Sequence, residues 1–321
     1  MNQTARHEQV MANLSSRLDS MLTLLGGANV HYVDVPVYDN VGDQLILLGA
    51  LKLLDEGNCR VIRRAAWYNF DTAWVRPGDV VVFQGGGNLG DIYPWSQGFR
   101  ERVIPRLKNN RVVIFPQTIK FQDANNEKRC AALFSQHPDL HLFVRDERSL
   151  KIAECMTTNV ALMPDTAHRL WQPGTVHHGG DGTLGFFRVD EEASGWRPEG
   201  VFKTCTDWAA VTEPVRARMR SDNRAMVYAH RLNLDRMLGN WLMGRWLQTC
   251  EQTVLLAKSL FSSHAQIQTD RLHGHILSTL LAIPHVLFDN SYGKNHAYAG
   301  LWTSESPLVK LERFHENRSA K

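Results

Sequence analysis

The chain has 321 residues, of which 43% are hydrophobic and 21% are charged, and this balance excludes a disordered chain, a collagen-like fibre and a disulfide-rich miniprotein. Lys and Arg number 36 against 33 Asp and Glu, so the net charge of +3 excludes the basic footprint of a nucleic-acid-binding protein but not a local cationic pocket. The length suits two domains, or one large domain, with a substantial core.

The ends of the chain and its cysteines point to a cytoplasmic protein. The N-terminus has no signal-peptide core, and no apolar run reaches the length of a membrane-spanning helix. The five cysteines are scattered and form no CxxC pair, which is typical of reduced thiols rather than of a zinc or redox site. Neither an HExxH motif nor an aspartate-rich loop is present, so no metal is expected.

Helices and short apolar strands alternate in the first half of the chain. Apolar residues at helical spacing predict a helix over 8–25, which ends at two glycines. Between about residues 28 and 170 the pattern predicts a parallel sheet covered by helices on both faces. The expected strands are 30–35, 80–84, 111–115, 141–144 and 160–163, and the expected helices are 44–54 and 149–156.

A second α/β unit is predicted after a linker at 172–182, which is rich in Gly and turn formers. We therefore expect an α/β fold of two Rossmann-like domains, residues 1–175 and 183–321, with a central cleft. The C-terminal tail is expected to pack back on their junction. The second domain is expected to contain strands 183–188, 225–229, 265–268 and 284–289, and helices 234–260 and 272–281.

Ligands of open parallel sheets bind at the carboxyl ends of the strands, so residues that follow strands matter most. After the first strand, Asn40 and Asp43 can either cap a helix or contact a polyol. Gly86 and Asn88 lie in a GxGxxG pattern, but the next strand ends without the acid that a dinucleotide site needs, so the glycines more simply bring backbone N–H groups close to an anion. Asp165 is a further carboxylate at a strand end.

Cationic side chains follow the strands of the second predicted domain. Arg188, Arg271 and Lys294 lie at three strand ends, and His273 is two residues beyond Arg271. Gly274 would allow a ligand to approach the start of the following helix. A capped helix with a buried histidine is the structural alternative. Several cations that converge at one sheet edge favour a compact polyanion as the ligand.

Taken together, these residues resemble the polysaccharide pyruvyl transferase family over most of the chain. The resemblance implies a fold like the GT-B glycosyltransferases, phosphoenolpyruvate as the donor substrate with no cofactor, and a cyclic pyruvate ketal on a sugar of an exopolysaccharide or cell-envelope precursor as the product. It rests on these motifs: Asp39-Asn40-Val41-Gly42-Asp43, Gly85-Gly86-Gly87-Asn88, Phe115-Pro116-Gln117-Thr118, Arg145-Asp146, Met163-Pro164-Asp165, Arg188-x-Asp190-x-Glu192, Thr269-Asp270-Arg271-Leu272-His273-Gly274 and Asn290-x-x-Gly293-Lys294.

The resemblance implies roles for Arg188, Arg271 and His273, and the other roles given next are our own mechanistic hypothesis. Arg188 and the Arg271-Leu272-His273-Gly274 motif would bind phosphoenolpyruvate, which carries close to three negative charges, with Lys294 as a helper. His273 is expected to act as the acid or base, because a histidine titrates near neutral pH. Either Asp43 or Asp165 would deprotonate the acceptor hydroxyl, and the sequence does not choose between them.

The acceptor is expected on the first domain and phosphoenolpyruvate on the second. Trp67, Tyr68, Tyr93 and Trp95 either stack on sugar rings or pack in the core. The expected partner is a glycan or lipid-linked oligosaccharide, without nucleic acid, and such an acceptor suits peripheral contact with the inner face of the membrane. Two alternatives remain open, namely a GT-B glycosyltransferase that uses a nucleotide sugar and a non-catalytic sugar- or phosphate-binding module.

Overall fold

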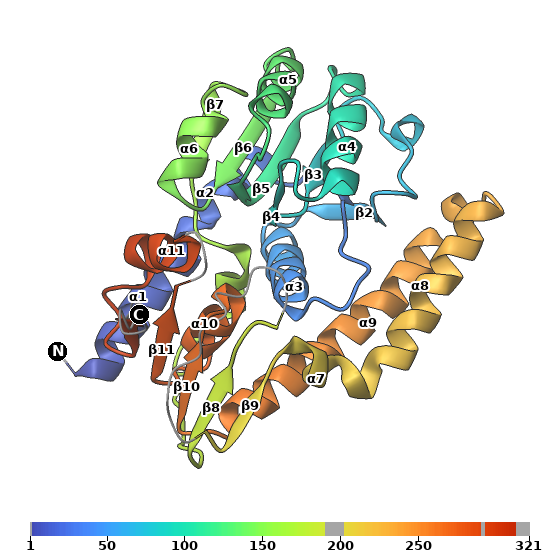
Figure 1. Cartoon of the computed structure of the whole chain (residues 1–321). Coiled ribbons are helices and arrows are strands. Elements are labelled where there is room, and N and C mark those ends of the chain that lie inside the picture. Colours follow the sequence, from blue (N-terminus) through green and yellow to red (C-terminus); the bar gives the residue numbers. More distant parts are fainter. Residues whose placement is uncertain (1, 190–201, 290–292, 313–321) are drawn as a thin grey trace, which may run out of the picture. The chain divides into compact units, whose positions relative to one another are not determined.

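The computed structural model describes residues 2–189, 202–289 and 293–312 (Figure 1). Asp190, Glu192 and Asn290 of the sequence motifs lie outside these described residues. Within them, the chain forms a mixed α/β fold with two parallel sheets, as the alternating pattern predicts. No helix in the described ranges is long and apolar enough to cross a membrane.

The chain divides into two compact units made of interleaved segments. We call residues 15–170 with 214–252 the first unit, and residues 1–14, 171–213 and 253–321 the second unit. Each predicted domain is one continuous stretch of the chain. In the structure, residues 1–14 belong to the second unit and residues 214–252 to the first. Buried hydrogen bonds account for the exchange: His7 Nε2 bonds the Thr279 carbonyl at 3.0 Å, and Trp246 Nε1 donates to the Pro36 carbonyl at 2.9 Å.

The first unit contains a parallel sheet in the order β2-β1-β3-β5-β6-β7, with β4 paired to β5. Short runs of buried apolar residues, such as the four of β3, form strands because both faces of the sheet are covered. The strands are β1 (Asn29–Val33), β2 (Arg60–Ala65), β3 (Val80–Phe83), β4 (Gly86–Leu89), β5 (Val112–Ile119), β6 (Leu140–Val144) and β7 (Asn159–Leu162).

Helices of the first unit connect these strands and cover the sheet. One core cluster joins Phe83 of β3 and Ile114 of β5 to Phe99 and Phe134 of two of these helices. The helices are α2 (Asp19–Leu25), α3 (Val41–Glu56), α4 (Pro94–Val103), α5 (Ala124–Phe134), α6 (Glu147–Ala153) and α8 (Arg216–Arg231), with 3-10 turns η1 (Thr72–Trp74), η2 (Ile104–Arg106) and η3 (Thr166–Leu170). Helix α9 (Asp235–Ser262) starts in this unit and continues into the second.

The second unit contains a parallel sheet in the order β12-β11-β10-β8-β9. Its tail segment, 293–312, supplies α11 and the edge strand β12, which pairs with β11. The strands are β8 (Thr183–Phe186), β9 (Thr204–Thr206), β10 (Gln266–Thr269), β11 (His285–Phe288) and β12 (Val309–Glu312). The helices are α1 (Gln3–Arg17), of which residues up to 14 belong here, α7 (Trp208–Thr212), α10 (Leu272–Leu280) and α11 (Lys294–Trp302), with the turn η4 (Glu213–Val215).

Two expected elements are corrected by the structure. The strand predicted at 225–229 is wrong, because this segment lies inside helix α8. Its buried residues Met219, Asp222, Met226 and Ala229 follow helical spacing, and the short apolar run alone could not distinguish the two conformations. The single helix predicted at 8–25 is interrupted at Leu18, which separates α1 from α2.

Candidate active site

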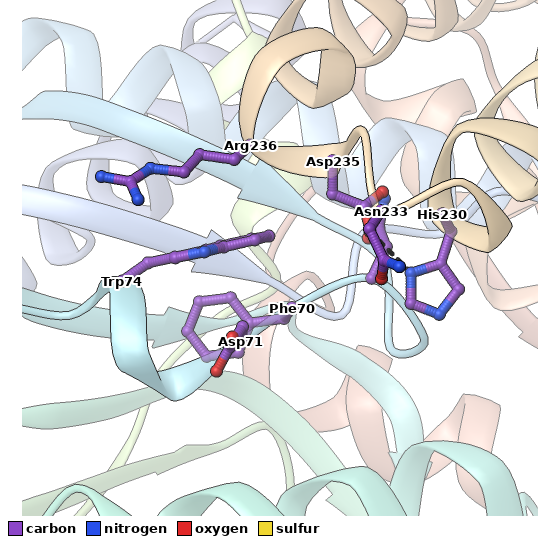
Figure 2. A pocket seen from close by; sticks show the side chains of 8 residues that line it. Phe70, Asp71, Trp74, His230, Asn233, Asp235 and Arg236 are labelled. Carbon is purple, nitrogen blue, oxygen red and sulfur yellow. Dashed lines mark hydrogen bonds and ion pairs between the residues drawn. The ribbon is translucent and has the colours of Figure 1, made fainter.

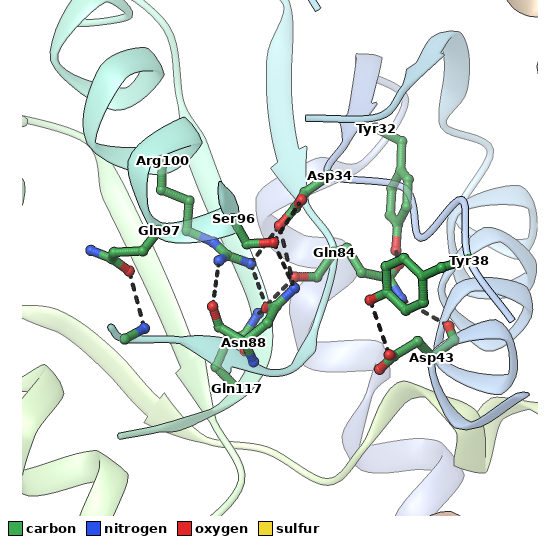
Figure 3. Close-up of polar contacts among 11 residues, drawn as sticks. Tyr32, Asp34, Tyr38, Asp43, Gln84, Asn88, Ser96, Gln97, Arg100 and Gln117 are labelled. Carbon is green, nitrogen blue, oxygen red and sulfur yellow. Dashed lines mark hydrogen bonds and ion pairs between the residues drawn. The ribbon is translucent and has the colours of Figure 1, made fainter. Parts of the chain in front are cut away.

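The start of α3 holds the two polar residues predicted after the first strand. Asn40 is the N-cap: its Oδ1 accepts the Gly42 N–H at 3.0 Å. Its Nδ2 donates to Asp43 Oδ2 at 2.8 Å. The Tyr38 hydroxyl donates to the same oxygen at 3.0 Å (Figure 3). Asn40 therefore caps the helix, and it also orients the half-buried carboxylate of Asp43.

The glycine turn brings the main chain against this carboxylate. Gly86 has a φ of +131°, which side chains other than glycine rarely adopt, and a Cβ here would lie 3.4 Å from Asp43 Oδ1. Asn88 Oδ1 accepts hydrogen bonds from Arg100 Nη2 at 2.7 Å and from Gln117 Nε2 at 3.1 Å. Asn40, Asp43, Gly86 and Asn88 thus meet at the carboxyl edge of the first sheet.

A buried ion pair in the same region was missed by the sequence analysis. Asp34, directly after β1, pairs with Arg100 of α4 at 2.8 Å, and both side chains are buried (Figure 3). Burial raises the pKa of Asp34, although the Arg100 charge and a hydrogen bond from Ser96 oppose the shift. Asp34 directly follows a predicted strand, and that position could have marked it as a candidate site residue. Arg100 lies inside a helix, and no sequence pattern marks it as a candidate.

The other candidate base, Asp165, has a different environment. Its side chain is 1% exposed and forms a buried ion pair with Arg145, which follows β6. Its Oδ1 also accepts the Ala167 N–H at 2.9 Å, so it holds the turn η3. These contacts suit a structural carboxylate, whereas Asp43 is half-buried and bonded by neutral donors.

The second unit holds the predicted arginines. The Arg188 N–H, after β8, donates to Asp270 Oδ1 at 2.8 Å, and Arg271 makes a two-point ion pair with Asp207 through Nε and Nη2. Burial raises the pKa of Asp270, opposed by the Arg188 N–H and by the charges of both arginines. Asp207 was missed in the sequence, and Asp270 was noted there only as part of the motif, without a role. With both carboxylates present, this edge of the sheet is less strongly cationic than the pattern predicted.

The Arg-Leu-His-Gly motif forms the start of α10. The Arg271 N–H donates to Thr269 Oγ1 at 3.0 Å, Leu272 is buried and His273 is half-buried. A Cβ on Gly274 would lie 2.6 Å from the same Thr269 oxygen. Glycine is therefore required for the helix to start this close to β10, and this approach places Arg271 and His273 at the sheet edge.

The start of α11 joins this edge. Lys294 is the first residue of the helix, after Gly293 with a φ of +83°. The neighbouring Asn295 donates through Nδ2 to the Asp270 carbonyl at 2.5 Å and to the Phe288 carbonyl at 3.0 Å. The structure thus brings the Arg188, Arg271 and Lys294 segments together around Asp270. No group of three or more His, Cys, Asp or Glu side chains in the described ranges is placed to hold a metal ion.

Three of the four aromatic residues singled out in the sequence, Trp67, Tyr68 and Trp95, pack together in the first unit. Trp67 stacks on Trp95 with ring centroids 5.5 Å apart, and Tyr68 packs edge-on against Trp67. Trp95 is 69% exposed and Tyr93 is 46% exposed. Because the Trp95 ring reaches solvent, it offers a flat apolar surface of the kind that sugar rings stack on, whereas Trp67 is half-buried.

Comparisons with known proteins agree with these motifs. The model of the family described as polysaccharide pyruvyl transferase matches residues 40–292. The Bacillus subtilis (strain 168) protein named "Putative pyruvyl transferase EpsO" is 36% identical over 308 residues, covering 94% of each chain. Schizosaccharomyces pombe "Pyruvyl transferase 1" is 27% identical over 297 residues, covering 86% of this chain and 70% of its own.

A solved structure supports the fold. The crystal structure of a functionally uncharacterized Klebsiella pneumoniae protein superposes with a TM-score of 0.60 and 19% identity, over 94% of this chain and 98% of that one. At that identity the likeness concerns the fold alone, and the family follows from the sequence matches. The chain belongs to the polysaccharide pyruvyl transferase family and is a transferase.

Proposed function

We propose that the protein transfers pyruvate from phosphoenolpyruvate to two hydroxyls of one sugar in a polysaccharide precursor, forming a cyclic ketal and releasing phosphate. The observation that carries this proposal is the convergence of Arg188, Arg271 and the start of α10 at one edge of the second sheet. Guanidinium groups and a helix N-terminus suit a donor that carries both a phosphate and a carboxylate.

The reaction needs a proton donor, cationic groups and a base. An acid, for which His273 is our candidate, protonates the methylene carbon of phosphoenolpyruvate, and a sugar hydroxyl adds to the positively polarised C2. The C2–O bond to phosphate then breaks, and a second hydroxyl of the same sugar closes the ketal. One hydroxyl proton replaces the proton that the acid gave to the new methyl group, and the other leaves with phosphate. Arg188 and Arg271, helped by Lys294, would neutralise the donor.

The acceptor is proposed to bind the first unit. Asp43 is our candidate base, because its carboxylate is half-buried and oriented by Tyr38 and Asn40, whereas Asp165 is held by Arg145. The exposed Trp95 ring suits a sugar of the glycan. The proposal includes two Rossmann-like domains in a GT-B-like arrangement with a central cleft, in a cytoplasmic enzyme whose glycan acceptor is carried on a lipid at the membrane.

Phosphate release tests the reaction directly. The purified chain is incubated with phosphoenolpyruvate and a deacylated, lipid-free glycan precursor, and the product is examined by NMR for a ketal methyl group. Acceptor-dependent phosphate release together with that signal supports the proposal. Thermal stabilisation by UDP-sugars and not by phosphoenolpyruvate would favour the glycosyltransferase alternative. Stabilisation by phosphoenolpyruvate with no phosphate release from any precursor would favour a binding module.

A further inference from the structure

Helices α8 and α9 form a hairpin whose charge differs from that of the rest of the chain. Residues 216–250 contain seven arginines and two aspartates and neither lysine nor glutamate, a net charge of +5. Since the whole chain has a net charge of +3, the remainder carries −2. Both aspartates are buried, Asp222 at 1% exposure and Asp235 at 8%. The exposed surface of the hairpin is therefore cationic.

The buried acids explain how the two helices are joined. Asp222 of α8 accepts the Thr249 hydroxyl at 2.9 Å and pairs with Arg245 of α9 at 2.8 Å. Arg218 donates to Gln248 across the pair at 3.3 Å. These contacts hold α8 and α9 side by side up to the turn that joins them (Figure 1). The buried acids therefore make contacts within the hairpin, and the arginines on its outer face are exposed to solvent.

The outer face of α8 has a regular pattern. Arg220, Arg224 and Arg231 are exposed and lie at helical spacing, opposite the buried Met219 and Met226. Arg220 and Arg224 border an open hollow of about 400 Å³ whose other lining residues are small, Ala217 and Ser221. Two guanidinium groups one turn apart over small side chains leave room for a phosphate group.

Large apolar side chains are exposed around the turn that follows these arginines. Tyr228, Leu232, Met237 and Trp241 are 63%, 67%, 71% and 60% exposed. They lie within 14 residues around the turn: Tyr228 is in α8, Leu232 is the C-cap of α8, and Met237 and Trp241 are one turn apart in α9. A cluster of this size at the end of a hairpin is unusual for a surface that meets water alone.

The inner side of the turn is firmly anchored, so this exposure is not the result of a loose loop. His230 bonds Asp235 at 2.6 Å, and Arg63 Nη1 donates to the Asp235 carbonyl at 3.1 Å. His230 and Asp235 also line a pocket of about 240 Å³. Figure 2 shows them with Phe70 and Trp74 on the other side of this pocket. The hairpin end is thus a defined surface with a cationic stripe and an apolar tip.

We propose that the α8–α9 hairpin docks the protein on an anionic lipid bilayer, with the arginines of α8 at the phosphate groups and the apolar side chains at the turn inserted between the lipids. Arginines beside Trp, Met and Leu side chains are the combination that binds the interface of anionic membranes. Charge complementarity selects this occupant over a neutral surface. The inference rests on the surface alone and does not depend on the donor or acceptor of the reaction.

Sedimentation with lipid vesicles tests the proposal in the absence of substrate. The full chain is mixed with vesicles of phosphatidylcholine alone or with about one third phosphatidylglycerol. We expect at least tenfold tighter binding to the anionic vesicles, and weaker binding as salt is raised. The triple variant Arg220→Glu, Arg224→Glu, Arg231→Glu should lose at least tenfold in affinity, and the double variant Met237→Ser, Trp241→Ser should lose several-fold.

Matched control variants distinguish binding through the hairpin from a general effect of charge or hydrophobicity. Arg106→Glu, Lys108→Glu, Lys128→Glu makes the same charge change at exposed positions of the first unit outside the hairpin, and Leu255→Ser removes an exposed apolar side chain about 21 Å along α9 from Trp241. Both should bind as the wild type does. Equal loss in a control, no preference for anionic lipid, or tighter binding to single-stranded DNA than to vesicles would overturn the proposal.

Discussion

Arg271 and Asp207 form a two-point ion pair at the carboxyl edge of the second sheet, between residues 64 positions apart in the sequence. Asp207 also accepts the Trp208 N–H at 2.7 Å as the N-cap of α7. The aspartate therefore uses two of the five N–H donors of Arg271 and fixes the plane of its guanidinium. A guanidinium held in one orientation binds an anion with less loss of conformational entropy than a freely rotating one.

Arg271→Lys keeps the charge but removes this fixed geometry. We expect kcat/KM for phosphoenolpyruvate to fall at least tenfold, because a lysine cannot be held at two points. Steady-state phosphate release measures the change. The control is Arg129→Lys, in which an exposed arginine paired with the half-buried Glu101 is replaced, and it should leave the rate unchanged. An Arg271→Lys enzyme with wild-type kcat/KM would show that the guanidinium does not meet the donor.

His273→Gln tests the proposed acid. Loss of a general acid lowers kcat by roughly 100-fold or more, while a half-buried position at the start of a helix should leave the melting temperature close to that of the wild type. The matched control is His141→Gln, which removes a histidine bonded to Asp139 in the first unit. Near-normal turnover by His273→Gln would remove this residue from the mechanism.

The two candidate bases differ in what their loss should do. Asp43→Asn is expected to lower kcat by about 100-fold or more with a small change in stability. Asp165→Asn leaves the charge of Arg145 buried without its carboxylate, so the free energy of unfolding should fall by roughly 3–5 kcal/mol. Denaturant unfolding and turnover are measured on both variants. A stable, inactive Asp165→Asn beside an active Asp43→Asn would reverse the assignment.

Gly274→Ala tests the close approach of α10 to β10. The added Cβ would lie 2.6 Å from Thr269 Oγ1, so the helix start that carries Arg271 and His273 must shift. We expect a loss of about 1–3 kcal/mol in stability and a lower kcat/KM. In Gly300→Ala, on helix α11, the Cβ meets nothing within 4 Å, so stability should rise slightly. Equal behaviour of the two variants would contradict the packing argument.

A buried histidine pair predicts how stability depends on pH. His285 Nδ1 faces the Ile283 carbonyl at 2.8 Å and must donate, so its Nε2 accepts from His275 Nδ1 at 2.7 Å. Burial lowers the pKa of His285 to about 4. Below about pH 6.5 the unfolded chain takes up a proton that the folded chain excludes, so stability falls between pH 6.5 and 4, on the order of 3 kcal/mol from this group.

Urea unfolding at several pH values measures how the free energy of unfolding depends on pH. His285→Gln removes the titrating group, so its stability should change less steeply with pH than that of the wild type, whatever its stability at neutral pH. Burial also lowers the pKa of His7 and His137, so some slope should remain in the variant. If the stability of the variant depends on pH as steeply as that of the wild type, folding does not lower the pKa of His285.

Local patterns in the sequence determined most of the secondary structure. The four apolar residues of β3 and the helical spacing of α10 specify their conformations through residues adjacent in the chain. Residues 225–229 are one exception, because five apolar-rich residues fit a strand as well as a helix and packing against α9 decides between them. The break at Leu18 in the helix predicted at 8–25 is another. The rule that ligands bind at the carboxyl ends of strands was enough to select Arg188 and Arg271.

Only the tertiary structure decided which charged side chains pair and to which unit residues 1–14 and 214–252 belong. Asp34 after β1 pairs with Arg100 of helix α4, and Asp207 after β9 pairs with Arg271 after β10. Each pair forms because the packed fold brings together residues that are distant in the chain. The same holds for His7, which bonds residues near the other end of the chain. The sequence alone determined the fold class, the family motifs and the candidate residues, whereas their partners, and hence their chemistry, depend on contacts that form only when the sheets assemble.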